Sequence, residues 1–164
     1  MKLTMFAWGN PSRGDDAVGP WFADRFRARE GENFALVEDF QLQVEHLLDC
    51  RESQLLLFVD ACSSGGGDYR FEEVAAGPLV SHTSHYLAPQ ELLAYYQQVF
   101  KETPPPAFLL AVPGHSFDLG EEMSPATLTC CELAAGFVEQ LLHSPGDSQW
   151  REFVDANGAE SGRA

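Results

Sequence analysis

Carboxylates and imidazoles occur at three separate places in the sequence from which they could share one site. Asp15 and Asp16 follow an apolar run near the N-terminus, and Asp60 follows a second apolar run. His82 and His85 stand in a stretch rich in Ser and Thr, just ahead of a helical pattern. Asp16, Asp60 and His85 together offer two oxygens and one nitrogen, a donor set that suits a divalent metal such as nickel or zinc. Three ligands leave coordination positions open, unlike a structural zinc site.

Each acid follows a segment whose pattern is typical of a buried strand. Residues 3–8 are apolar and end in the turn sequence 9–12, and residues 55–59 form an unbroken apolar run before Asp60. Because ligands of open α/β sheets bind at the carboxyl ends of strands, we expect the acids at one edge of a sheet. Two plainer interpretations stay open: Asp15 or Asp16 caps the helix that follows, and Asp60 caps a loop of Ser and Gly.

The first loop is a poor phosphate cradle. The sequence GNPSRG (9–14) has no Lys-Ser/Thr after its last glycine, and the paired acids that follow it would repel a phosphate. We therefore expect the acids that follow this loop to bind a cation.

Apolar periodicity predicts strands that alternate with helices. The predicted strands are 3–8, 34–40, 55–59, 69–74 and 107–112, and the predicted helices are 18–29, 41–48, 89–99 and 125–143. We therefore expect one three-layer α/β domain over residues 1–143, with a mostly parallel twisted sheet of about five strands flanked by helices. Residues 144–164 are rich in Gly, Ser and charge, and we expect a mostly disordered tail with Trp150, Phe153 and Val154 as possible anchors.

The charge balance limits the kinds of partner. The 164 residues include 10 Lys and Arg against 25 Asp and Glu, a formal charge of −15, which argues against nucleic acid and anionic membranes and permits metal ions or a basic protein segment. No apolar run approaches the length of a membrane span, and no secretory signal is visible. The four cysteines show no zinc-binding spacing. We expect a cytoplasmic protein with reduced thiols.

Four stretches of the sequence resemble one family. The run GNPSRGDDAVGP (9–20) is similar to the N-terminal signature of the hydrogenase maturation endopeptidases. These enzymes remove a C-terminal extension from the large-subunit precursor of nickel–iron hydrogenases. The VDA strand end at 59–61, His85 with Leu93 eight residues on, and the stretch GHSFDLGEEMSP (114–125) also fit the family pattern. The resemblance spans Leu3 to about Leu142.

The resemblance implies a function and a site. It implies an endopeptidase, acting as a monomer on a large-subunit precursor, in which Asp16, Asp60 and His85 contact the nickel already held by the precursor. No permanently bound cofactor is then expected. Four neighbours are weaker candidates for the same site: Asn10, Asp15, Gln43 and His82.

One stretch departs from the family pattern. Many relatives have a Gly-Gly-Thr type turn where this chain has Asp39-Phe40-Gln41-Leu42-Gln43. The variant resembles the branch that serves soluble, NAD-coupled bidirectional hydrogenases. Gln43 is then a candidate to hydrogen-bond the scissile peptide.

The motifs that the sequence lacks bear on the mechanism. It contains no GxSxG elbow and no HExxH pair, and no cysteine stands in a recognisable nucleophile context, with Cys62 the nearest alternative. A chain without a nucleophile and with an incomplete metal site fits a reaction in which the metal arrives with the substrate. Three alternatives stay open: a hydrolase with its own zinc, a non-catalytic nickel-site chaperone, and a receiver-like domain. The last would need a Lys after the final strand, where residues 113–115 are Pro-Gly-His.

Overall fold

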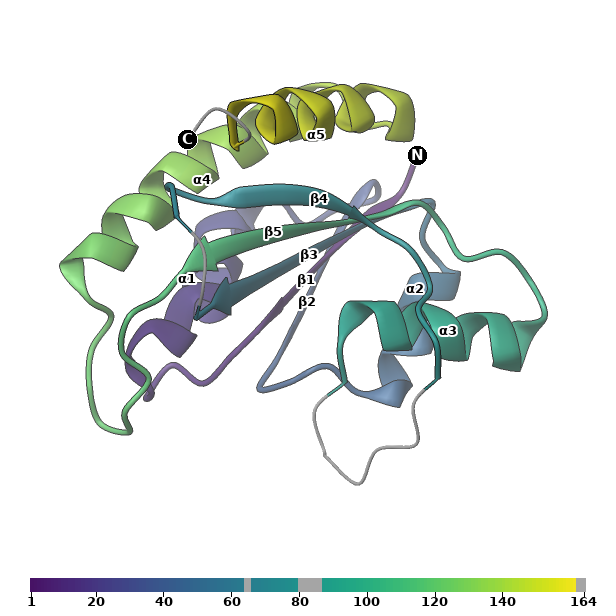
Figure 1. The fold of residues 1–164 in the computed structure, drawn as a ribbon. Helices are drawn as coiled ribbons and strands as arrows, with labels where there is room; N and C mark the ends of the chain where they lie inside the picture. The colour runs from purple at the N-terminus through teal and green to yellow at the C-terminus, as the bar shows by residue number, and fades with distance from the viewer. Residues whose placement is uncertain (64–65, 80–86, 162–164) are drawn as a thin grey trace.

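A five-stranded sheet forms the centre of the molecule. The computed structural model describes residues 1–63, 66–79 and 87–161, and side chains as far as Val154 in the last helix. The strands are β1 (Leu3–Trp8), β2 (Phe34–Asp39), β3 (Leu55–Cys62), β4 (Arg70–Val74) and β5 (Ala107–Pro113). They lie in the order β2-β1-β3-β5-β4, and only β4, at one end, runs antiparallel to its neighbour. This arrangement confirms the predicted mostly parallel α/β sheet (Figure 1).

Helices cover both faces of this sheet and make three layers (Figure 1). The helices α1 (Val18–Phe26), α4 (Pro125–His143) and α5 (Asp147–Ser161) lie on one face, and α2 (Leu47–Arg51) and α3 (Pro89–Phe100) lie on the other. Three short 3-10 turns complete the elements: η1 (Gly14–Ala17), η2 (Arg27–Arg29) and η3 (Val44–His46).

The central strand was predicted from its unbroken apolar run, and it is the middle strand of the sheet. Leu55 through Val59 are fully buried, because α1 and α4 cover one face of β3 and α2 and α3 cover the other. The strand continues further than predicted, to Cys62. Its register with β5 pairs Asp60 with Ala111, so Asp60 lies within the strand and is no cap of the following loop.

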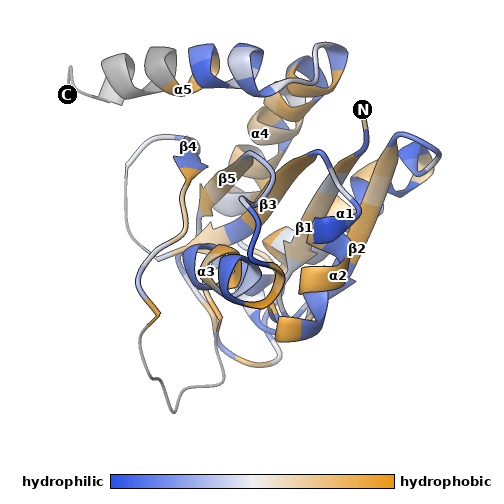
Figure 2. Cartoon of the chain, turned by 90° about the vertical axis from the view of Figure 1, so that its right-hand side faces the viewer, coloured by the Kyte–Doolittle hydropathy of each residue, from blue (hydrophilic) through white to orange (hydrophobic). Residues whose placement is uncertain are grey.

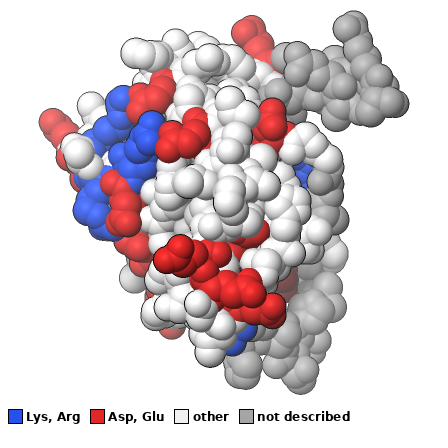
Figure 3. Space-filling view, turned by 90° about the vertical axis from the view of Figure 1, so that its left-hand side faces the viewer, with Lys and Arg blue, Asp and Glu red and all other residues white. Residues whose placement is uncertain are grey.

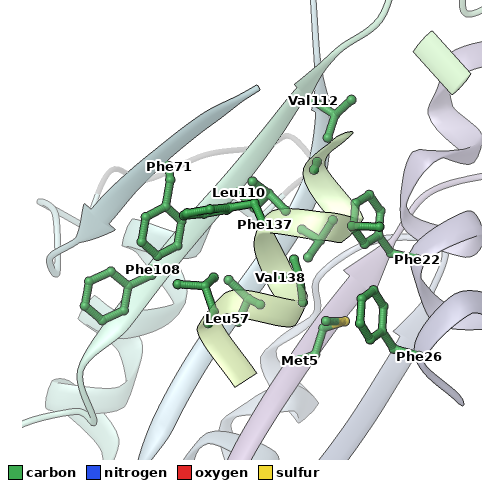
Figure 4. Close-up of a cluster of buried hydrophobic side chains, with 14 of the residues drawn as sticks. Met5, Phe22, Phe26, Leu57, Phe71, Phe108, Leu110, Val112, Phe137 and Val138 are labelled. Atoms are coloured by element: carbon green, nitrogen blue, oxygen red, sulfur yellow. The ribbon is translucent and has the colours of Figure 1, made fainter. Parts of the chain in front are cut away.

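One face of the sheet carries an aromatic-rich core. Phe22 and Phe26 of α1 stack on each other at 6.1 Å beside Met5, while Phe71 and Phe137 meet edge to face at 5.0 Å (Figure 4). Figure 2 shows the hydrophobic colour concentrated on the strands, with hydrophilic residues on the outer sides of the helices. The burial of both faces is what holds the carboxyl ends of β1 and β3 side by side.

The C-terminal segment differs from the expected disordered tail. Residues 147–161 form α5, and Trp150 is fully buried against Phe71 and Phe108. Its indole Nε1 donates a hydrogen bond to the carbonyl of Leu141 at 3.1 Å. The polar composition of residues 144–164 predicts disorder. Trp150, Phe153 and Val154 are nevertheless spaced as neighbours on a helix, and together they form its apolar face.

Helix starts follow local chemistry in only part of the chain. Ser124 caps α4, accepting a hydrogen bond from the backbone N–H of Thr127, with Pro125 in the first turn. Asp15 and Asp16 do not cap α1, whose N-cap is Ala17; both lie in the preceding turn η1. Within the described residues, no helix combines the length and the apolar character that crossing a bilayer requires.

Candidate active site

Asp16 and Asp60 lie at the carboxyl edge of the sheet, as predicted. Asp16 is in η1, directly after β1, and η1 packs against β3, whose end carries Asp60. Burial raises the pKa of Asp60 to about 7, the hydrogen bond from the backbone N–H of Ala61 opposes this, and the negative charge of Asp16 adds to it. The two carboxylates are therefore within electrostatic reach of each other. An arriving cation would relieve both their repulsion and the cost of burying Asp60.

Asp16 is held by the loop in front of it. The backbone N–H of Asn10 donates to Asp16 Oδ2 at 2.7 Å, and Asn10 Oδ1 accepts from the backbone N–H of Ser12 at 2.9 Å. Gly9 has a φ of +150°, and a Cβ there would lie 2.0 Å from the carbonyl oxygen of Asp16. Only glycine allows this approach, which explains the glycine that ends the first strand. Asn10, one of the weaker candidates, thus lies beside Asp16.

Asp15 has a different environment from its neighbour. Its side chain is fully buried, and its carboxylate accepts hydrogen bonds from the backbone N–H groups of His115, Ser116 and Ser124 and from the hydroxyl of Ser124. Burial alone would raise its pKa, but the hydrogen bonds from these N–H groups outweigh burial and lower the pKa to about 2. Asp15 is a permanently ionised anchor inside the protein.

This anchor joins the first loop to residues 114–124. Asp15 N–H donates to the Ser116 carbonyl at 2.7 Å, and Gly14 N–H donates to the Glu121 carbonyl at 3.0 Å. Gly114 also needs its small size, because a Cβ there would lie 2.9 Å from the Cβ of Asp15. The stretch GHSFDLGEEMSP therefore supplies the donors for Asp15, a role that the sequence pattern did not indicate. Asp15 holds η1, and with it Asp16, against the sheet edge.

The third predicted ligand cannot be placed. His85 and His82 lie outside the described residues. Among the residues that the structure does describe, no three His, Cys, Asp or Glu side chains gather closely enough to hold a metal ion. Asp16 and Asp60 thus provide two carboxylates of a site, and His85 as their partner stays a prediction.

His46 was missed at the sequence level and lies beside the predicted candidate Gln43. The imidazole is buried; its Nδ1 accepts from the backbone N–H of Gln43 at 2.9 Å, and its Nε2 lies 3.4 Å from Asp39 Oδ2. These contacts fix the connection between β2 and η3. The three-residue spacing from Gln43 to His46 is the signal that could have indicated this turn.

A pocket of about 280 Å³ opens beside Asp16. One wall comes from Gly9 and Pro11 in the loop after β1 and from Pro20 of α1, and the other comes from the end of β2. The residues of this second wall are Glu38, Asp39 and Phe40. The pocket and the acid pair share the loop that carries Gly9 and Asn10. A polypeptide bound in the pocket would therefore pass close to Asp16.

Charges on the neighbouring surface are largely paired among themselves. Arg25, Arg27 and Arg29, around the end of α1, form ion pairs with acids of the same surface. Figure 3 shows basic side chains gathered in one patch with acidic side chains against them, and a separate acidic area lower on the same face.

Solved structures of hydrogenase maturation proteases share this fold. No family model matches the sequence, and no curated protein matches it. The NiFe hydrogenase maturation protease HycI from Thermococcus kodakarensis KOD1 is 21% identical, with a TM-score of 0.67 over 87% of this chain and 93% of that one. The hydrogenase maturating endopeptidase HybD from Escherichia coli is 16% identical, with a TM-score of 0.68 over 88% of this chain and 94% of that one. At these identities the likeness shows the fold alone.

Proposed function

We propose that this protein is an endopeptidase that removes the C-terminal extension of a nickel–iron hydrogenase large-subunit precursor after nickel has been inserted. The observation that carries the proposal is the Asp16 and Asp60 pair, at the carboxyl edge of a fold shared with solved hydrogenase maturation proteases. Those two proteins are a hydrogenase maturation protease and a hydrogenase maturating endopeptidase. The position and the chemistry of the acids supply the reason to extend it to this chain.

The nickel of the precursor is the proposed ligand of Asp16, Asp60 and His85. Two carboxylates that repel each other, one of them with its pKa raised to about 7, gain most from a cation. With no more than three ligands of its own, the chain leaves room for a metal that stays bound to its own protein. The nickel then positions the nearby peptide bond and can polarise its carbonyl or a water.

In this proposal each part of the chain has a stated task. Asp16 and Asp60 bind the incoming nickel, and Asp15 and Asn10 hold Asp16 in place. The protein needs no resident cofactor, and it works in the cytoplasm as a monomer. Cleavage is gated by nickel because an empty precursor gives the carboxylates nothing to bind.

The test is the mass of the precursor. The wild-type protein is incubated with a cognate large-subunit precursor, once nickel-loaded and once nickel-free, in parallel with Asp16→Asn and with the exposed control Asp24→Asn. We expect loss of a C-terminal peptide with nickel for the wild type and Asp24→Asn, and at least about a hundredfold slower loss for Asp16→Asn. Cleavage of the nickel-free precursor would contradict nickel gating.

Two other outcomes would point to the alternative functions. Binding of the loaded precursor without any shortening would indicate a nickel-site chaperone. Stoichiometric zinc in the purified protein, together with cleavage that a chelator abolishes before the precursor is added, would indicate a hydrolase with its own metal.

A further inference from the structure

The connection from β2 to α2 exposes three large apolar side chains. Phe40 is 66% exposed, Val44 51% and Leu48 66%. Val44 and Leu48 are four residues apart on the continuous turn of η3 and α2, so they share one side of it. One exposed apolar residue is ordinary, but three large ones in one short segment are typical of an interaction surface. We call these three residues the Phe40 surface.

The Phe40 surface continues into the pocket beside Asp16. Phe40 forms part of one wall of this 280 Å³ pocket, and Gly9, on the opposite wall, packs against the backbone of Asp16. A partner that binds over Phe40 would therefore extend through the adjoining pocket toward Asp16 and Asp60. This continuity ties the apolar patch to the candidate active site.

The neighbouring strand β2 offers backbone groups to an extended partner. It lies at the end of the sheet order, so its outer edge has no neighbouring strand among the described residues. The carbonyl of Asp39 faces β1, where it accepts from Gly9 N–H, and the carbonyl of Phe34 faces outward to Gly31 N–H. By alternation, the backbone N–H and C=O of Leu36 and Glu38 point outward.

The occupant that fits the exposed apolar side chains and the outward backbone groups of β2 is an extended polypeptide with backbone donors and acceptors and an apolar side chain.

We propose that the precursor's C-terminal segment binds as an extended strand along the outer edge of β2 and seats an apolar side chain against Phe40, Val44 and Leu48. The inference rests on the proposed function and assigns the surface that presents the scissile region to Asp16. Backbone pairing supplies affinity, and the Phe40 surface supplies selectivity for an apolar side chain.

The first test removes the apolar patch. The triple variant Phe40→Ser, Val44→Ser, Leu48→Ser is compared with Leu128→Ser, Leu133→Ser, which removes exposed apolar side chains from α4 on the other face of the sheet. We expect KM for the nickel-loaded precursor to rise about tenfold or more in the triple variant, with kcat at saturation kept and the melting temperature unchanged. The α4 variant should match the wild type.

The second test removes one backbone donor. Glu38→Pro deletes the outward N–H that the proposal gives to the precursor, and Glu38→Ala is its matched control because both lose the ion pair with Arg27. We expect Glu38→Pro to raise KM several-fold above Glu38→Ala, with both variants folded by circular dichroism.

The outcomes separate this inference from the proposed function. If the wild type binds the precursor but never cleaves it, the proposed function fails, and the dissociation constants of the same variants still test the surface. Unchanged KM and unchanged binding in the triple variant, beside an active wild type, would overturn the inference. So would a wild-type dimer that the triple variant converts to monomers with the same KM, because a second copy would then cover the surface.

Discussion

Asp15 and Asp16 are adjacent in the chain, yet their carboxylates have opposite tasks. Asp15 is fully buried and accepts hydrogen bonds from three backbone N–H groups, whereas Asp16 lies at the sheet edge near the charge of Asp60. The first arrangement stabilises a carboxylate by hydrogen bonds from within the protein. The second leaves a carboxylate available for the proposed ligand. Structural support and the proposed nickel binding are therefore divided between two consecutive residues.

Replacing these two acids one at a time should separate the two tasks. Asp15→Asn puts an NH₂ group among backbone donors, and we expect it to lower the free energy of unfolding by about 2–3 kcal/mol. Asp16→Asn removes a charge that repels Asp60, so its stability at pH 8 should equal or exceed that of the wild type. Urea denaturation of both variants measures the difference. Equal losses in the two variants would contradict the division.

The pKa of Asp60 leads to a prediction about pH. Its value in the folded protein, about 7, lies above the ordinary value of 3.8, so between these values the folded state binds more protons than the unfolded state. Its contribution to stability is therefore present below pH 4 and is lost as the pH rises to 7. Asp60→Asn should be more stable than the wild type at pH 8, by about 2 kcal/mol or more, and nearly equal to it at pH 4.

Thermal unfolding at both pH values checks this prediction. Asp15 gives the opposite slope, because its folded pKa of about 2 lies below 3.8, so its contribution is present above pH 4 and is lost as the pH falls to 2. A pH-independent difference between Asp60→Asn and the wild type would show that the carboxyl of Asp60 is not destabilised by burial.

At the scale of elements, α5 belongs to the folded domain chiefly through the buried side chain of Trp150, with Phe153 and Val154 also packed against the core. Trp150 fills the core between β4 and β5 and donates a hydrogen bond to the end of α4. Arg151 adds an ion pair to Glu73 of β4. The helix thereby covers part of the antiparallel edge strand β4 (Figure 1).

Removing the indole of Trp150 should therefore destabilise the whole domain. We expect Trp150→Ala to cost about 3–5 kcal/mol, because it opens a cavity and loses the hydrogen bond to Leu141. Deletion of residues 144–164 should cost at least as much, while Gln149→Ala, on the exposed side, should cost little. An unchanged melting temperature after the deletion would restore the earlier expectation of a disordered tail.

At the scale of the molecule, the sequence predicted what local patterns encode. Uncharged runs such as 55–59 gave the central strands, and their alternation with helical patterns gave the parallel sheet. The extension of β3 to Cys62 depends on its pairing with β5, and burial of Trp150 depends on the core it enters. Neither is encoded locally.

The candidate site was likewise predictable only where local sequence patterns determine it. The positions of Asp16 and Asp60 at one edge followed from strand ends alone, and the structure places both there. The partners of Asp15 lie a hundred residues further along the chain, so no local pattern could assign its role. His46 was missed because its contacts, with Asp39 and Gln43, belong to a turn whose shape the sequence leaves open.

The hydrogen bonds that the Asp15 carboxylate accepts have a consequence for synthesis on the ribosome. The donors that accept its buried charge belong to residues 115, 116 and 124, whereas both candidate nickel-binding acids have been made by residue 60. A nascent chain that has emerged only as far as β5 therefore contains Asp16 and Asp60 without the support that positions η1. Under the proposed function, competence to bind the nickel of a precursor then begins late in translation, once the segment before α4 has left the exit tunnel. An unfinished chain would thereby be kept from binding a precursor too early.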